Sequence, residues 1–248
     1  MNSLKSDLTK LKLSGIVKTL ETRNAFALEN KISYIEFLEL LIDDENANRL
    51  SNSYKRRFNR SSLTEQKQLE DYDFSYQPEL DKKQILELAS CRFINQKKNI
   101  IFMGKPGTGK THLANAIGLE ALKQNYKVIF MHLNDLIEKL FSARGDGTYQ
   151  YNIRNLLNAD LLIIDEIGFK KIPQNGLDDF FEIIRKKYEK GSIIITTNRN
   201  FEDWGKVFGD QALASAIIDR IVHHAHIIKI IGESYRIKNY NLKNNNKK

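Results

Sequence analysis

The chain has 248 residues, of which 41% are hydrophobic and 28% are charged, with 3 prolines, 13 glycines and a net charge of +8. This composition excludes the disordered, collagen-like and low-complexity classes, and the single cysteine, Cys91, excludes a disulfide framework and a cysteine-based zinc site. The N-terminal residues lack the apolar core of a signal peptide, and no apolar run approaches the roughly 18 residues of a membrane span, so we expect a cytoplasmic protein without a membrane partner.

Residues 1–70 are expected to form a small helical domain that binds DNA or a partner protein. Leucine and isoleucine recur there at spacings of three and four residues, as in Leu4, Leu8 and Leu11 and again in Leu38, Leu41 and Ile42. This period is that of amphipathic helices.

A cationic segment near the end of this domain is the candidate nucleic-acid interface. Within residues 53–60 stand two aromatic residues and four cations, namely Tyr54 and Phe58, and Lys55, Arg56, Arg57 and Arg60. Cations neutralise phosphates, and aromatic rings stack on bases or sugars. The alternative is a charged helix face on which the two aromatic residues, four apart, turn into the core.

Residues 71–80 are expected to be an extended linker, because they mix acidic and aromatic residues without a helical period and contain Pro78. Residues 81–236 then alternate short apolar runs with longer amphipathic ones, which is typical of a parallel sheet covered by helices on both faces. The expected strands are residues 99–103, 127–132, 160–165, 192–197 and 226–231. The expected helices are residues 81–95, 110–124, 134–143, 176–190 and 213–222.

Residues 104–111 read GKPGTGKT and fit the phosphate-loop pattern G-x-x-x-x-G-K-[ST], directly after an expected strand and at the start of an expected helix. Glycines let the backbone approach phosphates, while N–H groups of the loop and of the helix N-terminus point at them. The lysine reaches the β- and γ-phosphates, and the threonine hydroxyl binds Mg²⁺. The predicted phosphate-binding residues are Gly104, Lys105, Pro106, Gly107, Thr108, Gly109, Lys110, Thr111 and His112.

An apolar strand, residues 161–164, ends in two consecutive carboxylates, Asp165 and Glu166. Successive side chains of a strand point to opposite sides, and this pair leaves the carboxyl edge of the sheet, where the phosphate loop also lies. Asp165 suits the shell of a Mg²⁺ ion together with Thr111. Glu166 is the natural group to orient and polarise a water molecule that attacks the γ-phosphate.

Two further residues are catalytic candidates. Asn198 follows the expected strand 192–197, where an amide can hold a water molecule by donating and accepting at once; the alternative is a simple cap or turn. Arg220 is a cation in an otherwise apolar helix. It either reaches the nucleotide of a neighbouring subunit as an arginine finger, pairs with Asp219, or lies on the helix surface.

The end of the chain holds three histidines and a basic tail. His223, His224 and His226 lie close together in sequence, but no carboxylate cluster accompanies them, so we expect no metal site there. No acidic residue follows Glu233, and residues 237–248 combine lysines with asparagines. We expect a disordered tail that either contacts nucleic acid or only keeps the protein soluble.

Together these motifs resemble the AAA+ ATPases and, more narrowly, the IstB-type transposition helper proteins of insertion sequences, which are related to the DnaC-type helicase loaders. Phosphate loops and Asp-Glu pairs occur in many ATPases, whereas Tyr188-Glu189 and residues 219–225 and 232–236 are similar to the helper family. The matching stretches are residues 11–20, 34–41, 72–74, 104–114, 161–168, 185–189, 196–198, 204, 208–210, 218–225 and 232–236.

The resemblance implies a fold and a mechanism. The fold is α/β, an AAA+ P-loop NTPase whose five-stranded parallel sheet has the order 5-1-4-3-2, preceded by the small helical domain. The cofactors are ATP and Mg²⁺, hydrolysis gives ADP and phosphate, and Lys110, Glu166, Asn198 and Arg220 are catalytic. Asn198 is then the sensor-1 residue, Arg220 acts in trans, and Arg236 occupies a place that permits a sensor-2 role.

The resemblance also implies partners. These are double-stranded DNA, the transposase of the same element and further copies of the chain, which form a ring, spiral or filament; the activity is target selection and transposase stimulation. The nearest alternative is a DnaC-type replicative helicase loader, which docks on a helicase and prefers single strands. A small-molecule kinase and a nucleotide-gated module without hydrolysis are more distant alternatives.

Overall fold

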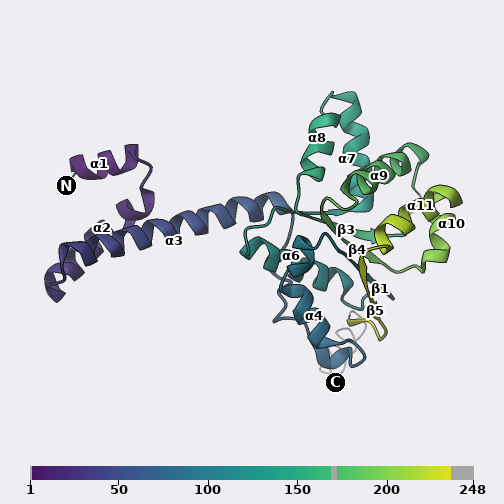
Figure 1. Cartoon of the computed structure of the whole chain (residues 1–248), viewed down its shortest axis with the longest axis horizontal. Helices are drawn as coiled ribbons and strands as arrows, with labels where there is room; N and C mark the ends of the chain where they lie inside the picture. Colours follow the sequence, from purple (N-terminus) through teal and green to yellow (C-terminus); the bar gives the residue numbers. More distant parts are fainter. Residues whose placement is uncertain (1, 169–171, 236–248) are drawn as a thin grey trace, which may run out of the picture. The chain divides into compact units, whose positions relative to one another are not determined.

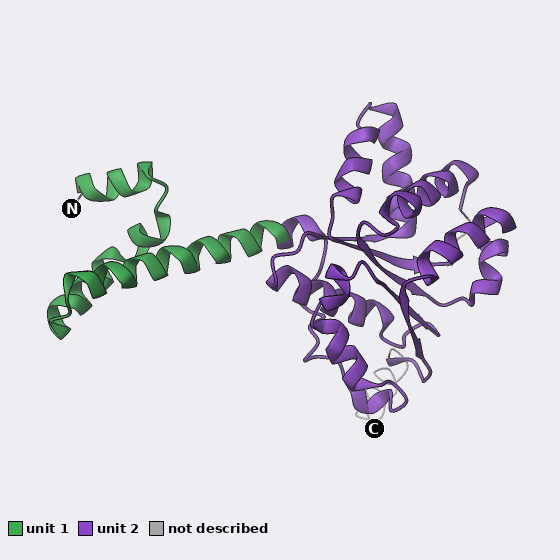
Figure 2. Cartoon of the chain, viewed as in Figure 1, with its two compact units in different colours: residues 1–57 green, residues 58–248 purple. Residues whose placement is uncertain are grey.

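The structure is a computed structural model that describes residues 2–168 and 172–235 (Figure 1). The chain divides between Arg57 and Phe58 into two compact units, which Figure 2 shows in separate colours. Arg236 and the expected basic tail, residues 237–248, lie outside the described residues. In the part of the chain that is described, no helix has both the length and the apolar character needed to cross a membrane.

The first unit is helical, as expected. It consists of α1 (Asn2–Lys10), α2 (Ser14–Asn30) and most of α3 (Tyr34–Ser61). A small apolar core joins α2 to α3 through Ile16, Leu20 and Leu41. The Glu45 carboxylate of α3 accepts hydrogen bonds from the backbone N–H groups of Gly15 and Ile16, at 2.6 and 3.3 Å, and thereby satisfies free donors at the start of α2.

A bidentate ion pair reinforces the same packing. The Arg23 guanidinium donates to both carboxylate oxygens of Asp44, at 2.7 and 2.8 Å. Hydrogen bonds from Arg23 and Thr19 lower the pKa of the Asp44 carboxyl to about 2. Asp44 is therefore negatively charged at neutral pH.

The second unit contains the sheet. Its strands are β1 (Asn99–Gly104), β2 (Val128–His132), β3 (Leu161–Ile167), β4 (Ser192–Thr197) and β5 (Ala225–Ile230). All pairs are parallel and the order is β2-β3-β4-β1-β5, so the expected order 5-1-4-3-2 is confirmed. The inner strands are buried on both faces, which explains why they appear in the sequence as continuous apolar runs.

Helices cover both faces of the sheet (Figure 1). On one face lie α6 (Lys110–Lys123) and α4 (Lys82–Ala89), with α5 (Arg92–Asn95) beyond them. The opposite face carries the larger apolar core, formed with α7 (Leu133–Gly145), α8 (Tyr149–Leu157), α9 (Gln174–Lys187), α10 (Trp204–Phe208) and α11 (Gln211–Val222). The sequence analysis did not anticipate α8 and α10. The expected helix 81–95 is also wrong as one piece, because Cys91 adopts a left-handed backbone conformation, with φ 60°, and separates α4 from α5.

The segment after α3 belongs to the second unit and packs against α6. Buried Asn115 of α6 accepts from the backbone N–H of Thr64 at 3.0 Å and donates to the Thr64 carbonyl at 2.8 Å. Tyr72 is buried, and residues 74–76 form a short 3-10 helix, Phe74–Tyr76. The boundary between the units lies before residue 70, where the sequence analysis expected it. Residues 71–80 are not a free extended linker, because their aromatic side chains have partners within the second unit.

Cys91 yields a test of the packing of this unit. Its side chain is fully buried, and burial raises the pKa of the Cys91 thiol to about 12. Thiol reagents attack the thiolate, so we expect labelling at pH 8 to be far slower in the native protein than in urea, where the thiol is accessible. Mass spectrometry after timed labelling measures both rates. Labelling of the native protein as fast as of the unfolded chain would contradict this packing.

Candidate nucleotide-binding site

The phosphate loop joins β1 to α6. Two of its glycines have left-handed backbone conformations, Gly107 with φ 81° and Gly109 with φ 93°, which side chains disfavour. Gly109 also caps the N-terminus of α6, so the helix begins where the loop ends. The sequence therefore places a helix N-terminus at the carboxyl edge of the sheet, an arrangement that favours anions.

Lys110 lies inside this loop. Its side chain is buried, and its ammonium donates to the carbonyl oxygens of Gly104 and Lys105, at 2.8 and 2.7 Å. The Thr108 hydroxyl also donates to the Lys105 carbonyl, at 2.9 Å, and closes the loop. A lysine ammonium held among carbonyls at the loop centre is positioned to exchange these acceptors for phosphate oxygens.

Thr111 and Asp165 meet beside the loop, as the sequence predicts. The Thr111 hydroxyl lies 2.9 and 3.1 Å from the two carboxylate oxygens of Asp165, which is fully buried. The Thr196 hydroxyl of β4 also donates to Asp165. A hydroxyl and a carboxylate form the hard oxygen set that Mg²⁺ prefers, so these residues fit that ion.

The strand is irregular at Glu166, whose carboxylate has an oxygen within 4.8 Å of one of Asp165. The pairing of β3 with β4 shifts between Ile164 and Ile167, and Glu166 has a left-handed backbone conformation with φ 62°. Its backbone N–H donates to the Thr196 hydroxyl at 3.0 Å, while its side chain is half exposed. The bulge thus turns one carboxylate inward and leaves the other accessible to solvent beside the loop.

His132 is a site residue that the sequence analysis missed. It ends β2 in register with Asp165, and its Nδ1 lies 3.3 Å from Asp165 Oδ2 and 3.7 Å from Glu166 Oε2. The imidazole therefore lies close to both carboxylates. A signal was present, because His132 is a polar residue at the end of an expected strand, as Asp165 is.

Asn198 follows β4 and is exposed. Since β4 lies between β3 and β1, its carboxyl end opens at the same edge as the loop and the carboxylates. The Asn198 Oδ1 lies 3.8 Å from the position that a Cβ atom on Gly168 would occupy, next to the end of β3. The topology therefore brings Asn198 to the predicted edge.

Arg220 lies at the opposite edge of the sheet. It lines a small pocket together with Asn99 and Ile193, which stand at the starts of β1 and β4. Its guanidinium donates to the Ala216 carbonyl at 2.8 Å and lies 5.2 Å from the centre of the Phe181 ring. Arg220 therefore does not join the loop residues of its own chain.

Tyr72 and Tyr235 contact the phosphate loop, and the sequence analysis gave neither residue a role there. A Cβ atom on Gly109 would lie 2.6 Å from the Tyr72 ring, and the Tyr72 hydroxyl donates to the Thr108 carbonyl at 3.3 Å. The backbone N–H of Tyr235 donates to the Gly107 carbonyl at 2.9 Å. Burial raises the pKa of both hydroxyls, so they remain neutral.

His112 belongs to this rear layer. Its Nε2 lies 2.6 Å from the Gln68 carbonyl, and its ring meets the edge of Tyr72 with 5.4 Å between ring centres. His112 thus supports the segment behind the loop, on the N-terminal side of the second unit. In this structure His112 therefore has a packing role.

The cationic segment lies on α3. Lys55, Arg56 and Arg60 are exposed, whereas Arg57 is half-buried and donates to the Ser53 hydroxyl at 2.7 Å. The two aromatic residues of the segment, Tyr54 and Phe58, are half-buried. The segment therefore combines a solvent-exposed cationic face with partly covered rings.

The chain has the same fold as solved structures of DnaA and of the DnaC helicase loader. AMPPCP-bound DnaA from Aquifex aeolicus is 25% identical, with a TM-score of 0.58 over 68% of this chain, and this chain spans about half of its length, 51%. The DnaC helicase loader is 23% identical, with a TM-score of 0.53 over 60% of this chain and 87% of that one. The fold is that of the AAA+ P-loop NTPases.

Sequence relatives are more specific. The IS21 putative ATP-binding protein of Pseudomonas aeruginosa is 38% identical over 96% of this chain and 90% of its own length. The IS232 putative ATP-binding protein of Bacillus thuringiensis subsp. berliner is 38% identical over 98% and 97%. The family model described as IstB-like ATP binding protein matches residues 6–243, and the chain therefore belongs to this family of ATP-binding proteins.

Proposed function

We propose that this protein hydrolyses ATP with Mg²⁺ and uses the reaction to assist the transposition of an insertion sequence. The observation that carries the proposal is the convergence of Thr111, Asp165 and Glu166 beside Lys110 at one edge of the sheet. A phosphate anchor, an oxygen pair for a metal and an accessible carboxylate are the parts that hydrolysis requires. A pure binding module has no need of the last one.

In the proposed reaction Lys110 binds the β- and γ-phosphates, and Thr111 and Asp165 hold Mg²⁺, which supplies positive charge that stabilises the phosphate oxygens. Glu166 accepts a proton from the attacking water as its oxygen bonds to the γ-phosphorus and the bond to ADP breaks. Asn198 orients the water. His132 lies close to both carboxylates.

Arg220 acts on the ATP of an adjacent copy. Its position at the opposite edge of the sheet supports this role, because an assembly that stacks one edge against the other brings Arg220 to a neighbouring phosphate loop. A guanidinium there stabilises the charge that develops on the γ-phosphate. ATP then favours assembly as a ring, spiral or filament, and hydrolysis reverses it.

The proposed assembly forms on double-stranded DNA through the cations of α3. The names of the relatives place those proteins in insertion sequences, which supports a role in target selection and stimulation of the transposase of the same element. The rival function is a helicase loader, favoured by the shared fold with DnaC. A loader prefers single-stranded DNA, so the preferred DNA form distinguishes the two.

The deciding experiment measures ATP turnover and particle size together, with double-stranded DNA, single-stranded DNA or no DNA. Light scattering at low and high salt gives the size, and phosphate release gives the rate. Large assemblies and changed turnover with double-stranded DNA support the proposal. Stimulation by single strands alone supports the loader, and a monomer under all conditions contradicts the assembly.

The DNA interface has its own test. We expect the triple variant Lys55→Ala, Arg56→Ala and Arg60→Ala to bind duplex DNA more weakly and to flatten the slope of log affinity against log salt by about 3, close to one for each lost phosphate contact. Fluorescence anisotropy across a salt series measures both. The matched control removes three exposed lysines elsewhere, Lys83, Lys139 and Lys206. Equal slopes in the two variants would contradict the interface.

A further inference from the structure

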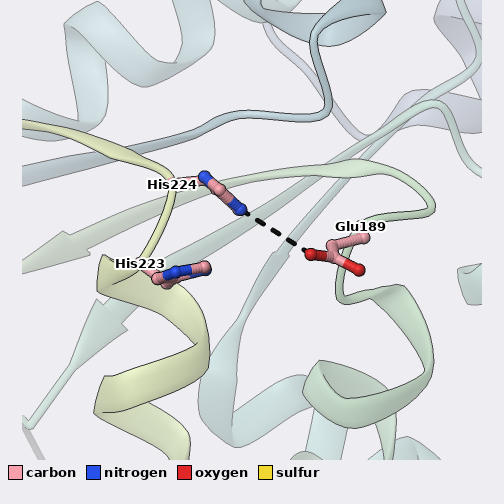
Figure 3. Close-up of side chains that lie close together, drawn as sticks. All are labelled: Glu189, His223 and His224. Atoms are coloured by element: carbon pink, nitrogen blue, oxygen red, sulfur yellow. Dashed lines mark ion pairs between the residues drawn. The ribbon is translucent and has the colours of Figure 1, made fainter.

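The fold brings a carboxylate to the histidines that follow α11. Glu189 follows Tyr188, the residue directly after α9, and the turn there lies against the segment that carries His223 and His224 (Figure 3). The sequence analysis expected no metal site here because no carboxylate accompanies the histidines along the chain. Tertiary structure supplies the missing carboxylate, since Glu189 reaches the histidines from the end of a distant helix.

The donor atoms of these three residues converge. Glu189 Oε1 lies 3.7 Å from His224 Nε2, and one donor atom from each of Glu189, His223 and His224 lies within 4.8 Å of the others. Ligands at about 2.0–2.2 Å from a tetrahedral zinc ion lie roughly 3.3 Å from one another. All three residues are exposed, so small side-chain rotations close the remaining distance, and solvent can supply a fourth ligand.

A neighbouring hydroxyl orients the first imidazole. The Tyr188 hydroxyl oxygen lies 2.8 Å from Nδ1 of His223. When Nδ1–H donates to that oxygen, the lone pair of the ring lies on Nε2, which is then the metal-binding atom. Ligating histidines commonly have such a partner on their second nitrogen.

The second imidazole is positioned by packing. The Tyr188 ring lies nearly parallel to that of His224, at 23° with 6.4 Å between ring centres, and the two histidine rings are 4.0 Å apart. Hydrogen bonds from the backbone N–H groups of Lys190 and Gly191 to the Lys187 carbonyl, at 3.0 and 3.1 Å, close the turn that carries Glu189. Tyr188 therefore packs beside His224, and the backbone turn that carries Glu189 is closed by its own hydrogen bonds.

We propose that Glu189, His223 and His224 bind a divalent transition-metal ion of the Zn²⁺ class. Two imidazole nitrogens and one carboxylate favour Zn²⁺, Ni²⁺ or Cu²⁺, whereas Mg²⁺ and Ca²⁺ prefer oxygen ligands alone. The site is separate from the oxygen pair of Thr111 and Asp165, because it lies near the opposite edge of the sheet. It does not depend on the proposed ATPase activity.

The position of the site has a consequence for Arg220. Glu189, His224 and Arg220 line the same pocket. A bound dication would add positive charge to the pocket that the Arg220 guanidinium also lines. On the proposed function, which this consequence alone requires, metal binding therefore alters the contact between Arg220 and the adjacent subunit.

Calorimetric titration of the metal-free full-length protein with Zn²⁺, in excess Mg²⁺ and without nucleotide, tests the site. We expect one Zn²⁺ per chain with micromolar or tighter affinity, and a visible absorption band when Co²⁺ is used as the probe. His223→Ala, His224→Ala and Glu189→Gln should each weaken binding at least 10-fold, as loss of one of few ligands does. The matched control, His226→Ala, should bind as the unaltered protein does.

Tyr188→Phe distinguishes the metal ligands from a residue that only orients one of them. It removes only the hydroxyl beside His223, so we expect one Zn²⁺ per chain with an affinity about 10-fold lower, the lower end of the effect of lost outer partners. Circular dichroism melts in chelator show whether each variant folds, and Glu189→Gln, which keeps the side-chain volume, is decisive if a histidine variant does not. Absence of Zn²⁺ binding at micromolar concentrations, or binding that all three ligand variants leave unchanged, would overturn the proposal.

Discussion

Glu166→Gln is expected to keep ATP binding and to lower ATP turnover about 100-fold or more, the contribution typical of a general base. Glutamine has nearly the same size and keeps the backbone hydrogen bond to Thr196, but its amide cannot accept the proton of the attacking water. The side chain is half exposed, so the change should not disturb the core. Phosphate release measures turnover, and a fluorescent ATP analogue measures binding.

Glu138→Gln is the matched control, because Glu138 is an exposed carboxylate of α7 remote from the loop. Its turnover should equal that of the unaltered protein. If Glu166→Gln keeps full turnover, Glu166 is not the base. If it loses ATP binding as well, the side chain has a structural or metal-holding role instead.

Arg220→Ala is expected to bind ATP normally and to lose about 1,000-fold in turnover, the lower end of the range for arginine fingers. The residue lies at the opposite edge of the sheet from the phosphate loop of its own chain, so its removal should not disturb that loop. Arg154→Ala, an exposed arginine of α8, is the control and should retain turnover.

Mixing two inactive variants tests whether Arg220 acts between copies. An Arg220→Ala chain retains Glu166, and a Glu166→Gln chain retains Arg220. If the finger acts in trans, a mixed assembly contains interfaces that are complete on both sides, so turnover should return. Turnover that stays absent in mixed assemblies, with both variants shown to co-assemble, would contradict action in trans.

The sequence predicted the sheet and the loop because both depend on local pattern. Buried parallel strands need apolar side chains on both faces, so residues 161–164 and 192–195 are recognisable without tertiary information. Gly107 and Gly109 are required because the backbone has positive φ there, and the following lysine and threonine complete the motif. Strand order came from family resemblance, and the topology confirmed it.

Features that depend on contacts between distant segments could not be predicted in this way. The approach of Glu189 to His224 depends on how α9 and α11 pack, and the placement of His132 depends on the register of β2 against β3. Cys91 interrupts an expected helix through a left-handed conformation that its residue type does not indicate. Burial of Tyr72 required a partner surface, the phosphate loop, that lies elsewhere in the sequence.

Tyr72 and Tyr235 connect the phosphate loop to two segments that are far apart in the sequence. One tyrosine comes from the segment just after α3 and the other from the last described residues of the chain, and the Tyr235 hydroxyl also donates to the Asp73 carbonyl. A displacement of either segment would therefore act on the loop directly and would not have to pass through the sheet.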